Sequence, residues 1–567
     1  MRKKKTDSGV TVQAITGTYV VVLGIDMDEA DTQELLGFAI HRTDPEENEA
    51  YWLTGMRTFE KSYPNPPDGA LVSTLDHPVQ DFLWSDFTAK PGRKYTYRVV
   101  PVSGKPKNLK YGEGVSIDVE TEQEASGKYS VYFNRAVIGS QAYARKFGVS
   151  PKALKGEKKV EAYEWLSRGL FEAIKDFLAL AKDESFGIRA AVYEFSYEPV
   201  IEAFAQAKKD CKDVQIIYDA RIANKKDGTP DPKMKKRVEE VQELLDKHGL
   251  SDSAIPRVEN PNYISHNKFI ILLENNEPIA VWTGSTNFSE SGIFGHANVG
   301  HLVRDVDVAK EYLAYWKRLK KDPHVDDLRP KNDEANPTLE DFPPPEGITT
   351  IFSPRGNLGQ LKWYGTAMNG AANLVCFTAA FGVNVVFREV FEIDRDYLRY
   401  VFLEKWGVNE ESARVTEEVL TKDFDIQVAV GAVLNDQMLY HWLKEFPNNL
   451  SVNVRFVHTK FMLIDPLGEE PIVISGSANF SDASTRENDE NMLIIRGDKR
   501  LADIYLGEFM RLWRHHRSRL IINKINEATG LDEGHNYLDP TSAWAQAFYK
   551  PGSVKFKRRS TFATAAQ

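Results

Sequence analysis

The chain has 567 residues, 42% of them hydrophobic and 27% charged, with a net charge of −10 at pH 7. This length is too great for one hydrophobic core and predicts three or four domain-sized units. The negative charge argues against a general binder of phosphate polymers, the two distant cysteines form no metal or redox motif, and no apolar run is long enough to span a membrane.

Basic residues gather at both ends of the chain, within Arg2–Lys5 and Lys550–Arg559. We expect both ends to be solvated tails, and any nucleic-acid binding would have to use these ends or a local groove. The first residues also lack the apolar core of a secretory signal. We therefore predict a cytoplasmic protein without stable membrane insertion.

Residues 10–125 are predicted to form an all-β domain. Short alternating runs, such as Val12–Ile15, are separated by polar turns. Pro91-Gly92 precedes an alternating segment that contains the pair Tyr95 and Tyr97, and this resembles the later strands of a fibronectin type III sandwich, although other β-sandwiches share the pattern. Such a domain would bind a protein or polymer, or act as a spacer, since it contains no catalytic cluster.

From residue 129 the pattern changes to alternating helices and strands, in two halves at 129–321 and 348–530. Each half closes with the same Glu-x4-Trp spacing, in Glu311–Trp316 and Glu508–Trp513. The predicted helices are Trp165–Ala181, Pro199–Lys209, Asp231–His248, Leu361–Asn369, Arg388–Trp406 and Gln437–Phe446, and the predicted strands include Ile188–Phe195, Val214–Tyr218, Asn373–Phe381 and part of Leu450–Asp465.

Two further segments flank the second half. Residues 322–347 contain six prolines among acidic residues and show no sustained period, which predicts a linker between the halves. Residues 531–567 are predicted to be a C-terminal extension that ends in the basic tail.

A composite motif occurs twice, once in each half. In both copies a Gly follows the His after 18 residues, an Asn follows it after 21, and the copy closes with Asn-Phe-Ser. Short motifs often arise by chance, but two copies with the same internal spacing indicate a duplicated unit. The copies are His266-x-Lys268 with Gly284-Ser285-x-Asn287, and His458-x-Lys460 with Gly476-Ser477-x-Asn479.

The residue types of this motif suit a phosphate group. His and Lys stand two residues apart at the start of an apolar run, so they share one face of a strand. Gly-Ser-x-Asn ends the next strand and adds neutral hydrogen-bond donors. Imidazole, ammonium and amide groups fit a phosphate oxyanion and include no carboxylate cage for a metal, so we predict neither metal nor cofactor. Two histidines also suit a double displacement at phosphorus.

These residues resemble the signature of the phospholipase D superfamily, H-x-K-x4-D followed by G-S-x-N, present twice. The second copy fits in full with Asp465, whereas Leu273 stands at the Asp position of the first copy. Glu274 lies one residue late, on the opposite face of the strand. Tyrosyl-DNA phosphodiesterases are among the relatives that also lack this Asp. The resemblance covers roughly residues 129–530 and implies a duplicated α/β fold, with two mixed sheets flanked by helices and related by a pseudo-two-fold axis.

The resemblance also implies a phosphodiester hydrolase that hydrolyses or transfers its substrate through a covalent phosphohistidine. Family precedent makes His266 the nucleophile and His458 the acid and base. The remaining residues expected to bind the oxyanion or to assist are Lys268, Lys460, Asn287, Asn479, Ser285 and Ser477. Asp465 is expected to support the second half.

Two acidic residues and two histidines near the motifs have open roles. Glu487 and Glu490 lie downstream of the second motif, where a carboxylate would either orient a catalytic imidazole or be a solvated loop charge. His296 and His301 follow the first motif, and a metal pair there would lack a partner carboxylate at ligand spacing.

The substrate is left open at this point. A phospholipid and a nucleic acid are the two phosphodiester classes in question. A catalytically silent scaffold is the third alternative, and the two complete His-Lys-Asn sets argue against it because a silent copy would have no chemical need for them.

Overall fold

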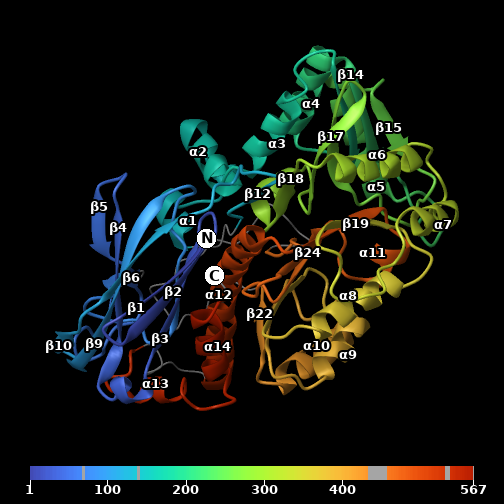
Figure 1. The fold of residues 1–567 in the computed structure, drawn as a ribbon. Helices are drawn as coiled ribbons and strands as arrows, with labels where there is room; N and C mark the ends of the chain where they lie inside the picture. Colours follow the sequence, from blue (N-terminus) through green and yellow to red (C-terminus); the bar gives the residue numbers. More distant parts are fainter. Residues whose placement is uncertain (65, 67–69, 137–140, 432–455, 530–536, 566–567) are drawn as a thin grey trace.

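The computed structural model describes residues 1–64, 66, 70–136, 141–431, 456–529 and 537–565. An all-β region, blue in Figure 1, lies beside two α/β halves, which are green and yellow to red. This arrangement agrees with the predicted fold class. Within the described residues, no helix is both long and apolar enough to cross a membrane.

The N-terminal region consists of two antiparallel sheets that share an apolar core, to which Phe38, Phe82 and Tyr97 belong. The first sheet has the order β1(Arg2–Asp7)-β2(Val10–Thr16)-β3(Val21–Met27)-β8(Leu83–Asp86). The second has the order β10(Asn108–Tyr111)-β9(Lys94–Lys105)-β4(Leu35–Asp44)-β5(Glu49–Trp52), and β11(Val115–Glu120) also pairs with β9. Smaller elements are η1(Glu29–Thr32), β6(Thr54–Gly55) and β7(Val72–Ser73). The assignment to the fibronectin type III family stays a prediction.

The C-terminal extension packs against this region, so the prediction of a solvated tail was wrong there. Trp544, from α13 (Ala543–Gln546), and Phe548 lie 5.6 and 5.0 Å from Phe82 between ring centroids. Helix α14 (Val554–Ala563) packs directly on β3. Its basic residues form ion pairs with aspartates of three other segments: Lys557 with Asp425, Arg558 with Asp81 and Arg559 with Asp26.

The basic N-terminus is also part of the fold. The Arg2 guanidinium lies 2.8 Å from the Asp503 carboxylate, and each side chain is only 2% exposed. Strand β1 pairs with β2 along its whole length, so the all-β region starts at residue 2 rather than 10. Lys3, Lys4 and Lys5 do face solvent as predicted. A buried ion pair therefore ties this end of the chain to the second half.

The first half contains a seven-stranded mixed sheet. Its order is β12(Tyr129–Phe133)-β18(Val299–Val303)-β17(Glu277–Gly284)-β16(Lys268–Glu274)-β13(Phe186–Val192)-β14(Asp213–Asp219)-β15(Ala254–Arg257). β13, β14 and β15 run parallel, and the other pairs are antiparallel. The helices are α1(Gln141–Phe147), η2(Pro151–Ala153), α2(Gly156–Ser167), α3(Leu170–Ala179), α4(Glu198–Cys211), α5(Pro232–Lys247), the π-helix η3(Ser291–Gly295) and α6(Val306–Leu319).

The second half repeats this topology. Its sheet has the order β19(Gly347–Ser353)-β25(Glu490–Arg496)-β24(Ile472–Gly476)-β23(Phe461–Ile464)-β20(Leu374–Ala379)-β21(Leu398–Leu403)-β22(Ile426–Val430). Read in chain order, both sheets follow the pattern 1-7-6-5-2-3-4, which confirms the duplication. The helices are α8(Gly359–Asn369), α9(Val385–Glu392), α10(Glu410–Lys422), α11(Asp482–Arg486) and α12(Lys499–Thr529).

The two motif-bearing strands are buried on both faces. In β16, Phe269 and Ile271 join the core between the halves, while Ile270 and Leu272 pack in the first half's own core. Phe461 and Leu463 of β23 join the same shared core. This double burial explains why both strands are apolar runs without alternation. Side chains of α6 and α12 complete the shared core between the sheets: Tyr312, Trp316, Tyr505 and Phe509.

Several predicted elements differ from the structure. The helix predicted at Trp165–Ala181 is split into α2 and α3 because Arg168 and Gly169 both have positive φ, at 48° and 86°. The helix predicted at Arg388–Trp406 is wrong, since α9 ends at Glu392 and the buried apolar run at 398–403 is β21. The helix predicted at Gln437–Phe446, and the start of Leu450–Asp465, lie outside the described residues.

The predicted linker at 322–347 contains a helix, α7 (Val325–Ala335). Its buried residues Val325 and Leu328 pack in the fold, and Pro330 lies inside it. The sequence pattern missed it because acidic residues and prolines conceal a short apolar face.

Candidate active site

The two motif histidines lie close together at the interface between the halves. His266 stands two residues before β16 and His458 three residues before β23. Their ring centroids are 6.4 Å apart, and each residue is 5% exposed. The rings are therefore near enough to act on a single phosphorus atom between them, as the sequence predicted.

Backbone pairing between the halves sets this placement. The His266 N–H donates to the Asp489 carbonyl at 3.0 Å, and the His458 N–H donates to the Ala297 carbonyl at 3.1 Å. Each histidine is thus bound to the segment that follows Gly-Ser-x-Asn in the opposite half. The residue after each of these partners, Glu490 or Asn298, turns its side chain toward the same histidine.

A carboxylate orients the first histidine. The His266 Nδ1 lies 2.9 Å from Glu490 Oε2. An ionised Glu490 accepts from Nδ1–H, which leaves the Nε2 lone pair free. Burial raises the pKa of Glu490 to about 8, against the opposing charge of Lys268. Burial also lowers the pKa of His266 well below its usual value, and Lys268 and Lys460 add to that effect. The unbound site therefore favours a neutral imidazole.

An amide orients the second histidine. The His458 Nδ1 lies 3.0 Å from the Asn298 Oδ1. The Asn298 Nδ2 donates to the Gly292 carbonyl at 2.6 Å, and this carbonyl can only accept, so the orientation of the amide is fixed. The Ser285 hydroxyl also donates to Oδ1, at 2.8 Å. His458 must therefore carry its proton on Nδ1 and keep Nε2 available.

The two motif lysines are buried beside the histidines. The ammonium of Lys268 donates to the His266 carbonyl, and that of Lys460 donates to the His458 carbonyl at 2.6 Å. Burial lowers the pKa of Lys268 to about 7, while Glu490, Glu194 and Asp219 counteract it. Burial and the neighbouring Lys268 lower the pKa of Lys460 well below its ordinary value. An incoming phosphate would supply the negative charge that these cations lack.

The motif asparagines and serines end the strands next to β16 and β23. The Oδ1 atoms of Asn287 and Asn479 are buried and have no hydrogen-bond partner among the described residues. Ser285 and Ser477 hold the backbone instead, because their hydroxyls accept from the N–H groups of Val299 and Asn491. The serines therefore support the backbone of the site. Each unpaired amide oxygen can accept a hydrogen bond, whereas a phosphate oxygen would have to be bound by the Nδ2 donor of the same side chain.

The remaining predicted residues divide into supporting and distant ones. The carboxylate of Asp465 accepts from the N–H groups of Ala372, Asn373 and Leu374 at 2.7 to 3.0 Å, which anchors the start of β20. Leu273 at the corresponding position of the first half is an apolar core residue. Glu487 only ends α11, so of the two candidate acids Glu490 alone contacts an imidazole.

The sequence analysis missed the role of Asn298, and it considered His296 only as half of a metal pair. The ring centroid of His296 lies 4.6 Å from that of His458, and its Nδ1 accepts from the Asn298 amide at 2.9 Å. Burial lowers the pKa of His296 to about 3. His301 instead contacts the Tyr505 hydroxyl through Nε2, so the two histidines do not form a metal pair. The sequence did contain a signal for Asn298: it lies 13 residues after the motif serine of its half, as Glu490 does in the other half.

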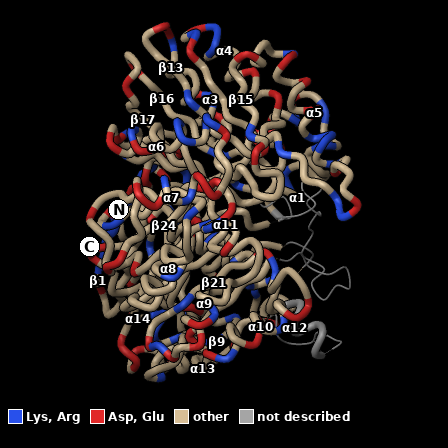
Figure 2. The backbone as a smooth tube through the Cα atoms, turned by 90° about the vertical axis from the view of Figure 1, so that its right-hand side faces the viewer, with Lys and Arg blue, Asp and Glu red and all other residues tan. Residues whose placement is uncertain are grey.

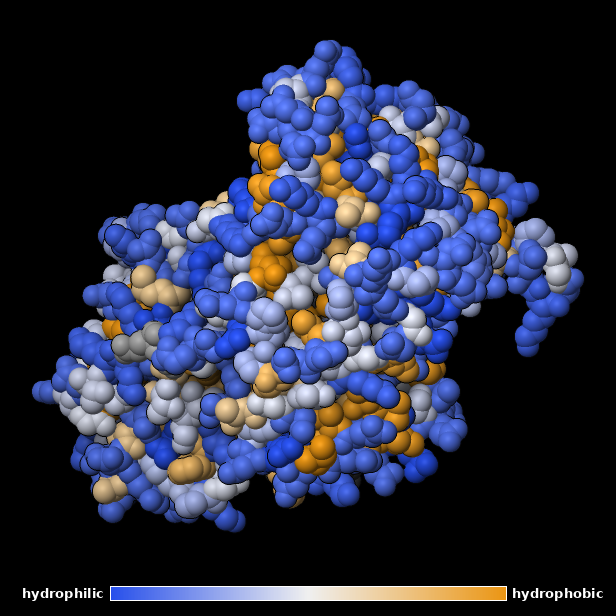
Figure 3. Space-filling view, turned by 45° about the vertical axis from the view of Figure 1, so that its right-hand side comes forward, coloured by the Kyte–Doolittle hydropathy of each residue, from blue (hydrophilic) through white to orange (hydrophobic). Residues whose placement is uncertain are grey.

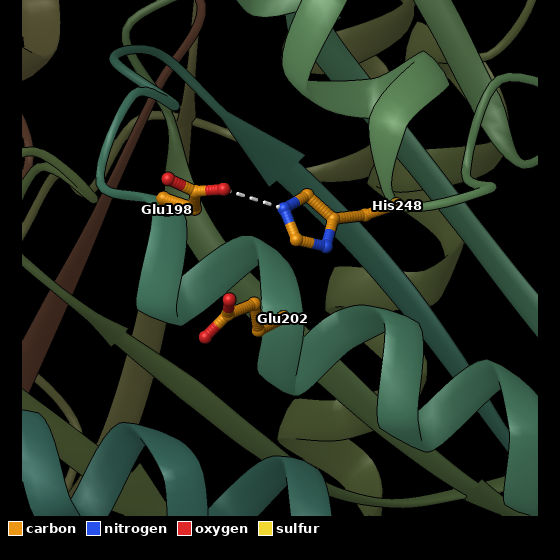
Figure 4. A group of neighbouring side chains, drawn as sticks. All are labelled: Glu198, Glu202 and His248. Carbon is orange, nitrogen blue, oxygen red and sulfur yellow. Dashed lines mark hydrogen bonds and ion pairs between the residues drawn. The ribbon is translucent and has the colours of Figure 1, made fainter.

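One group of metal-type ligands exists elsewhere in the described residues. Glu198 and Glu202 are one turn apart on α4, and the Glu198 carboxylate faces His248 (Figure 4). The Lys247 ammonium already lies 2.6 Å from the same carboxylate. A cation would have to displace that lysine, and we assign no ion to this group.

The comparisons with known proteins agree with this geometry. Residues 174–320 and 407–513 match the family described as "Cardiolipin synthase, PLD-like domain". No curated protein matches the chain. The two matched segments contain the two motifs, His266-x-Lys268 in the first and His458-x-Lys460 in the second. Each half of the duplicated fold therefore contains a segment that is similar to a phospholipase D-like domain.

Several solved structures show distant likeness. Polyphosphate kinase from Porphyromonas gingivalis has 12% identity and a TM-score of 0.34, covering 59% of this chain and 46% of that one. Phosphatidylserine synthase from Haemophilus influenzae has 12% identity and a TM-score of 0.42, covering 70% and 94%. Nuc from Salmonella typhimurium, a phospholipase D family member, has 14% identity and a TM-score of 0.22, covering 30% and 94%. The chain thus spans less than half the length of the polyphosphate kinase.

Proposed function

We propose that this protein hydrolyses or transfers a phosphodiester through a covalent phosphohistidine, without a metal ion. The observation that carries the proposal is the pair of buried imidazoles, 6.4 Å apart, each oriented through Nδ1 by the opposite half. Two ammonium groups and the side-chain amides of Asn287 and Asn479, whose Nδ2 groups are hydrogen-bond donors, belong to the same site. This arrangement supplies nucleophile, proton donor and oxyanion binding from side chains alone.

The unequal orienting groups assign the roles. Attack on phosphorus leaves His266 as a cationic phosphoimidazolium, and the Glu490 carboxylate would stabilise that charge. His458 faces a neutral amide, which gives its cationic form no such stabilisation and keeps it a stronger acid. We therefore assign His266 as nucleophile and His458 as acid and base.

In the first step, Nε2 of His266 attacks phosphorus and the bond from phosphorus to the leaving oxygen breaks. His458 must first gain a second proton, on Nε2, and it gives that proton to the leaving oxygen. In the second step, Nε2 of His458 takes a proton from water or an alcohol, whose oxygen attacks phosphorus. The bond between phosphorus and His266 then breaks, and both histidines return to their starting states.

The non-bridging oxygens gain hydrogen bonds from Lys268, Lys460, Asn287 and Asn479. Both ammonium groups are buried, so their attraction for a developing oxyanion is stronger than in water. The phosphate in turn restores their protonated state.

The test is turnover of bis-p-nitrophenyl phosphate by the full chain in the presence of EDTA. We expect activity that falls by roughly 10⁴-fold or more in His266→Ala and by 10² to 10⁴-fold in His458→Ala. His41→Ala, on β4 of the N-terminal region, is the matched control. Loss of activity with the chelator would contradict the metal-free mechanism, and an inactive folded wild type would support the silent scaffold instead.

A further inference from the structure

A basic segment follows strand β14 at the edge of the first half. Residues 221–237, called the basic segment below, contain seven Lys and Arg and only two Asp, in a protein whose net charge is −10. Five of its lysines are solvent-exposed: Lys225, Lys226, Lys233, Lys235 and Lys236. Figure 2 shows blue positions gathered around α5, which begins within this segment. This local charge runs against the charge of the molecule.

Strand pairing places the basic segment at the same sheet edge as the catalytic histidine. Val192 at the end of β13 pairs with both Tyr218 of β14 and Lys268 of β16. The next residue, Tyr193, lies over the site: its ring centroid is 5.0 Å from the His266 ring and 5.2 Å from the Lys268 ammonium. β14 ends at Asp219, beside this point.

Two arginines of the basic segment are fixed next to Tyr193. The Arg237 guanidinium lies 5.7 Å from the Tyr193 ring centroid and 2.5 Å from the Asp219 carboxylate. Arg221 lies 3.3 Å from the other oxygen of Asp219, whose side chain is fully buried. Two cations share the Asp219 carboxylate, and Glu194 is the other acid next to Tyr193. The Tyr193 ring lies close to both the Arg237 guanidinium and the Lys268 ammonium.

We propose that Arg237 and Arg221 form a second phosphate site, and that the exposed lysines of the basic segment extend it along a single-stranded nucleic acid. The inference rests on the proposed function, because the first phosphate is the one attacked by His266. A polymer with a phosphate at every residue matches a line of cations that begins at the catalytic centre.

An anionic membrane surface fits the basic segment less well. Membrane-binding surfaces combine cations with large apolar side chains that enter the lipid. No large hydrophobic residue of the basic segment is exposed. On the face drawn in Figure 3, apolar residues appear in separate areas with hydrophilic residues around them. The basic segment therefore fits a water-soluble polyanion better than a membrane surface.

The closing experiment measures binding without turnover. The full-length His266→Ala protein is titrated against a fluorescent oligodeoxythymidylate about 15 nucleotides long, a length that spans several phosphate contacts. Two variants are added to this background: Lys225→Gln with Lys226→Gln, and Arg237→Gln. The matched control is Lys3→Gln with Lys4→Gln on β1, which removes the same charge from the N-terminal sheet.

We expect Lys225→Gln with Lys226→Gln to weaken binding about 5-fold or more and to lower the salt slope by roughly 1.4, at about 0.7 per phosphate contact. The β1 control should leave both quantities unchanged. Arg237→Gln should weaken binding as well. Should that variant fail to fold, the surface lysine pair still decides the question.

Equal binding by the lysine variant and the β1 control would overturn the proposal. So would tight binding of phosphatidylglycerol vesicles that depends on these lysines while the oligonucleotide does not bind. The proposed function fails separately, through absent turnover of bis-p-nitrophenyl phosphate by the wild type, because the binding assay requires no catalysis.

Discussion

The two halves bring the same motif groups to their shared interface, but the residue that hydrogen-bonds the imidazole differs between them. The imidazole of His266 is hydrogen-bonded to the Glu490 carboxylate, and that of His458 to the Asn298 amide. Both orienting residues come from the opposite half and stand at the same distance after the motif serine. The two halves thus share the geometry and differ in the residue that contacts each imidazole, a difference on which the proposed roles rest.

A second difference concerns the support of each strand. Asp465 binds three backbone N–H groups in the second half, whereas Leu273 is an apolar core residue in the first. Up to this position the motif strands pair with β17 and β24 in the same register, and a register shift follows Leu272 in the first half. The motif Asp is thus a local anchor of the second half, and its absence from the first half leaves the catalytic groups in place.

The largest expected effect is that of a substitution that distinguishes the roles of the two histidines. In His458→Asn, turnover of an alkyl phosphodiester should fall by about 10³ to 10⁴-fold, because both proton transfers are lost. With bis-p-nitrophenyl phosphate, whose leaving group needs little protonation, the second step is slowed more than the first, and a phosphohistidine should accumulate. Mass spectrometry of the quenched protein should locate an acid-labile adduct on His266. An adduct on any other residue would reverse the assignment.

Exchange of the orienting groups should have the next largest effect. Glu490→Gln should lower kcat by roughly 10² to 10⁴-fold, because a neutral amide does not stabilise the cationic imidazole as a carboxylate does. Asn298→Asp should cost less, about 10-fold, through a weaker acid at His458. Steady-state kinetics on one diester would compare them. Equal losses in both variants would mean that the halves are chemically equivalent.

The pKa of Lys268 gives a pH-dependent prediction. Burial lowers this pKa to about 7, so the free enzyme loses the ammonium as pH rises through that value. The pKa of Glu490 is raised to about 8, and its carboxylate must be ionised. Since kcat/KM reports ionisations of the free enzyme, we expect it to peak between about pH 7 and 8 and to fall at higher pH as Lys268 loses its charge. In Lys268→Arg the guanidinium stays charged, so the descending limb should move to higher pH. An unchanged limb would assign the titration to another group.

His296 should have a moderate influence through its contact with the Asn298 amide. The corresponding residue of the second half is Asn488, so His296→Asn makes the two halves alike at this position. We expect kcat to fall roughly 3- to 10-fold, because the amide that orients His458 loses one acceptor. His301→Asn serves as the nearby control for burial. A thermal unfolding scan would separate this effect from instability.

The smallest expected effect is on stability. Asp465→Leu makes the second half resemble the first, but it removes the acceptor of three N–H groups, two of which lie near solvent. We expect a loss of about 1 to 2 kcal/mol in the free energy of unfolding. Urea denaturation measures it. A loss of activity greater than the loss of folded protein would show that this Asp serves the chemistry as well.

The sequence predicted much of this arrangement because the motif spacing is local. His266, Lys268, His458 and Lys460 stand at strand starts, where an H-x-K pattern and an apolar run are sufficient signals. The Glu490 contact was one of two open alternatives. The role of Asn298 was missed and that of His296 was read as a metal ligand, because both contact His458 across the interface and residue type alone does not indicate such a contact.

The ends of the chain show the opposite limit. Arg2 and the cations of α14 carry the same sequence signal as solvated tails, yet they pair with aspartates distant in the chain. The charge of a chain end therefore did not indicate whether its cations are exposed or paired. The basic segment was missed for a related reason. Its cations are a small share of those in the chain, and they matter only because the fold places them at the sheet edge that carries His266.

Each imidazole is hydrogen-bonded by the opposite half, so turnover should be possible only after the two halves have docked. A half that has folded by itself has a correct strand and a correct loop, but its imidazole lacks the partner that fixes its tautomer. During refolding, recovery of helical and sheet signals should precede recovery of turnover by the time that the halves need to dock. The rate of that last event is open to measurement with a chromogenic diester, without any label on the protein.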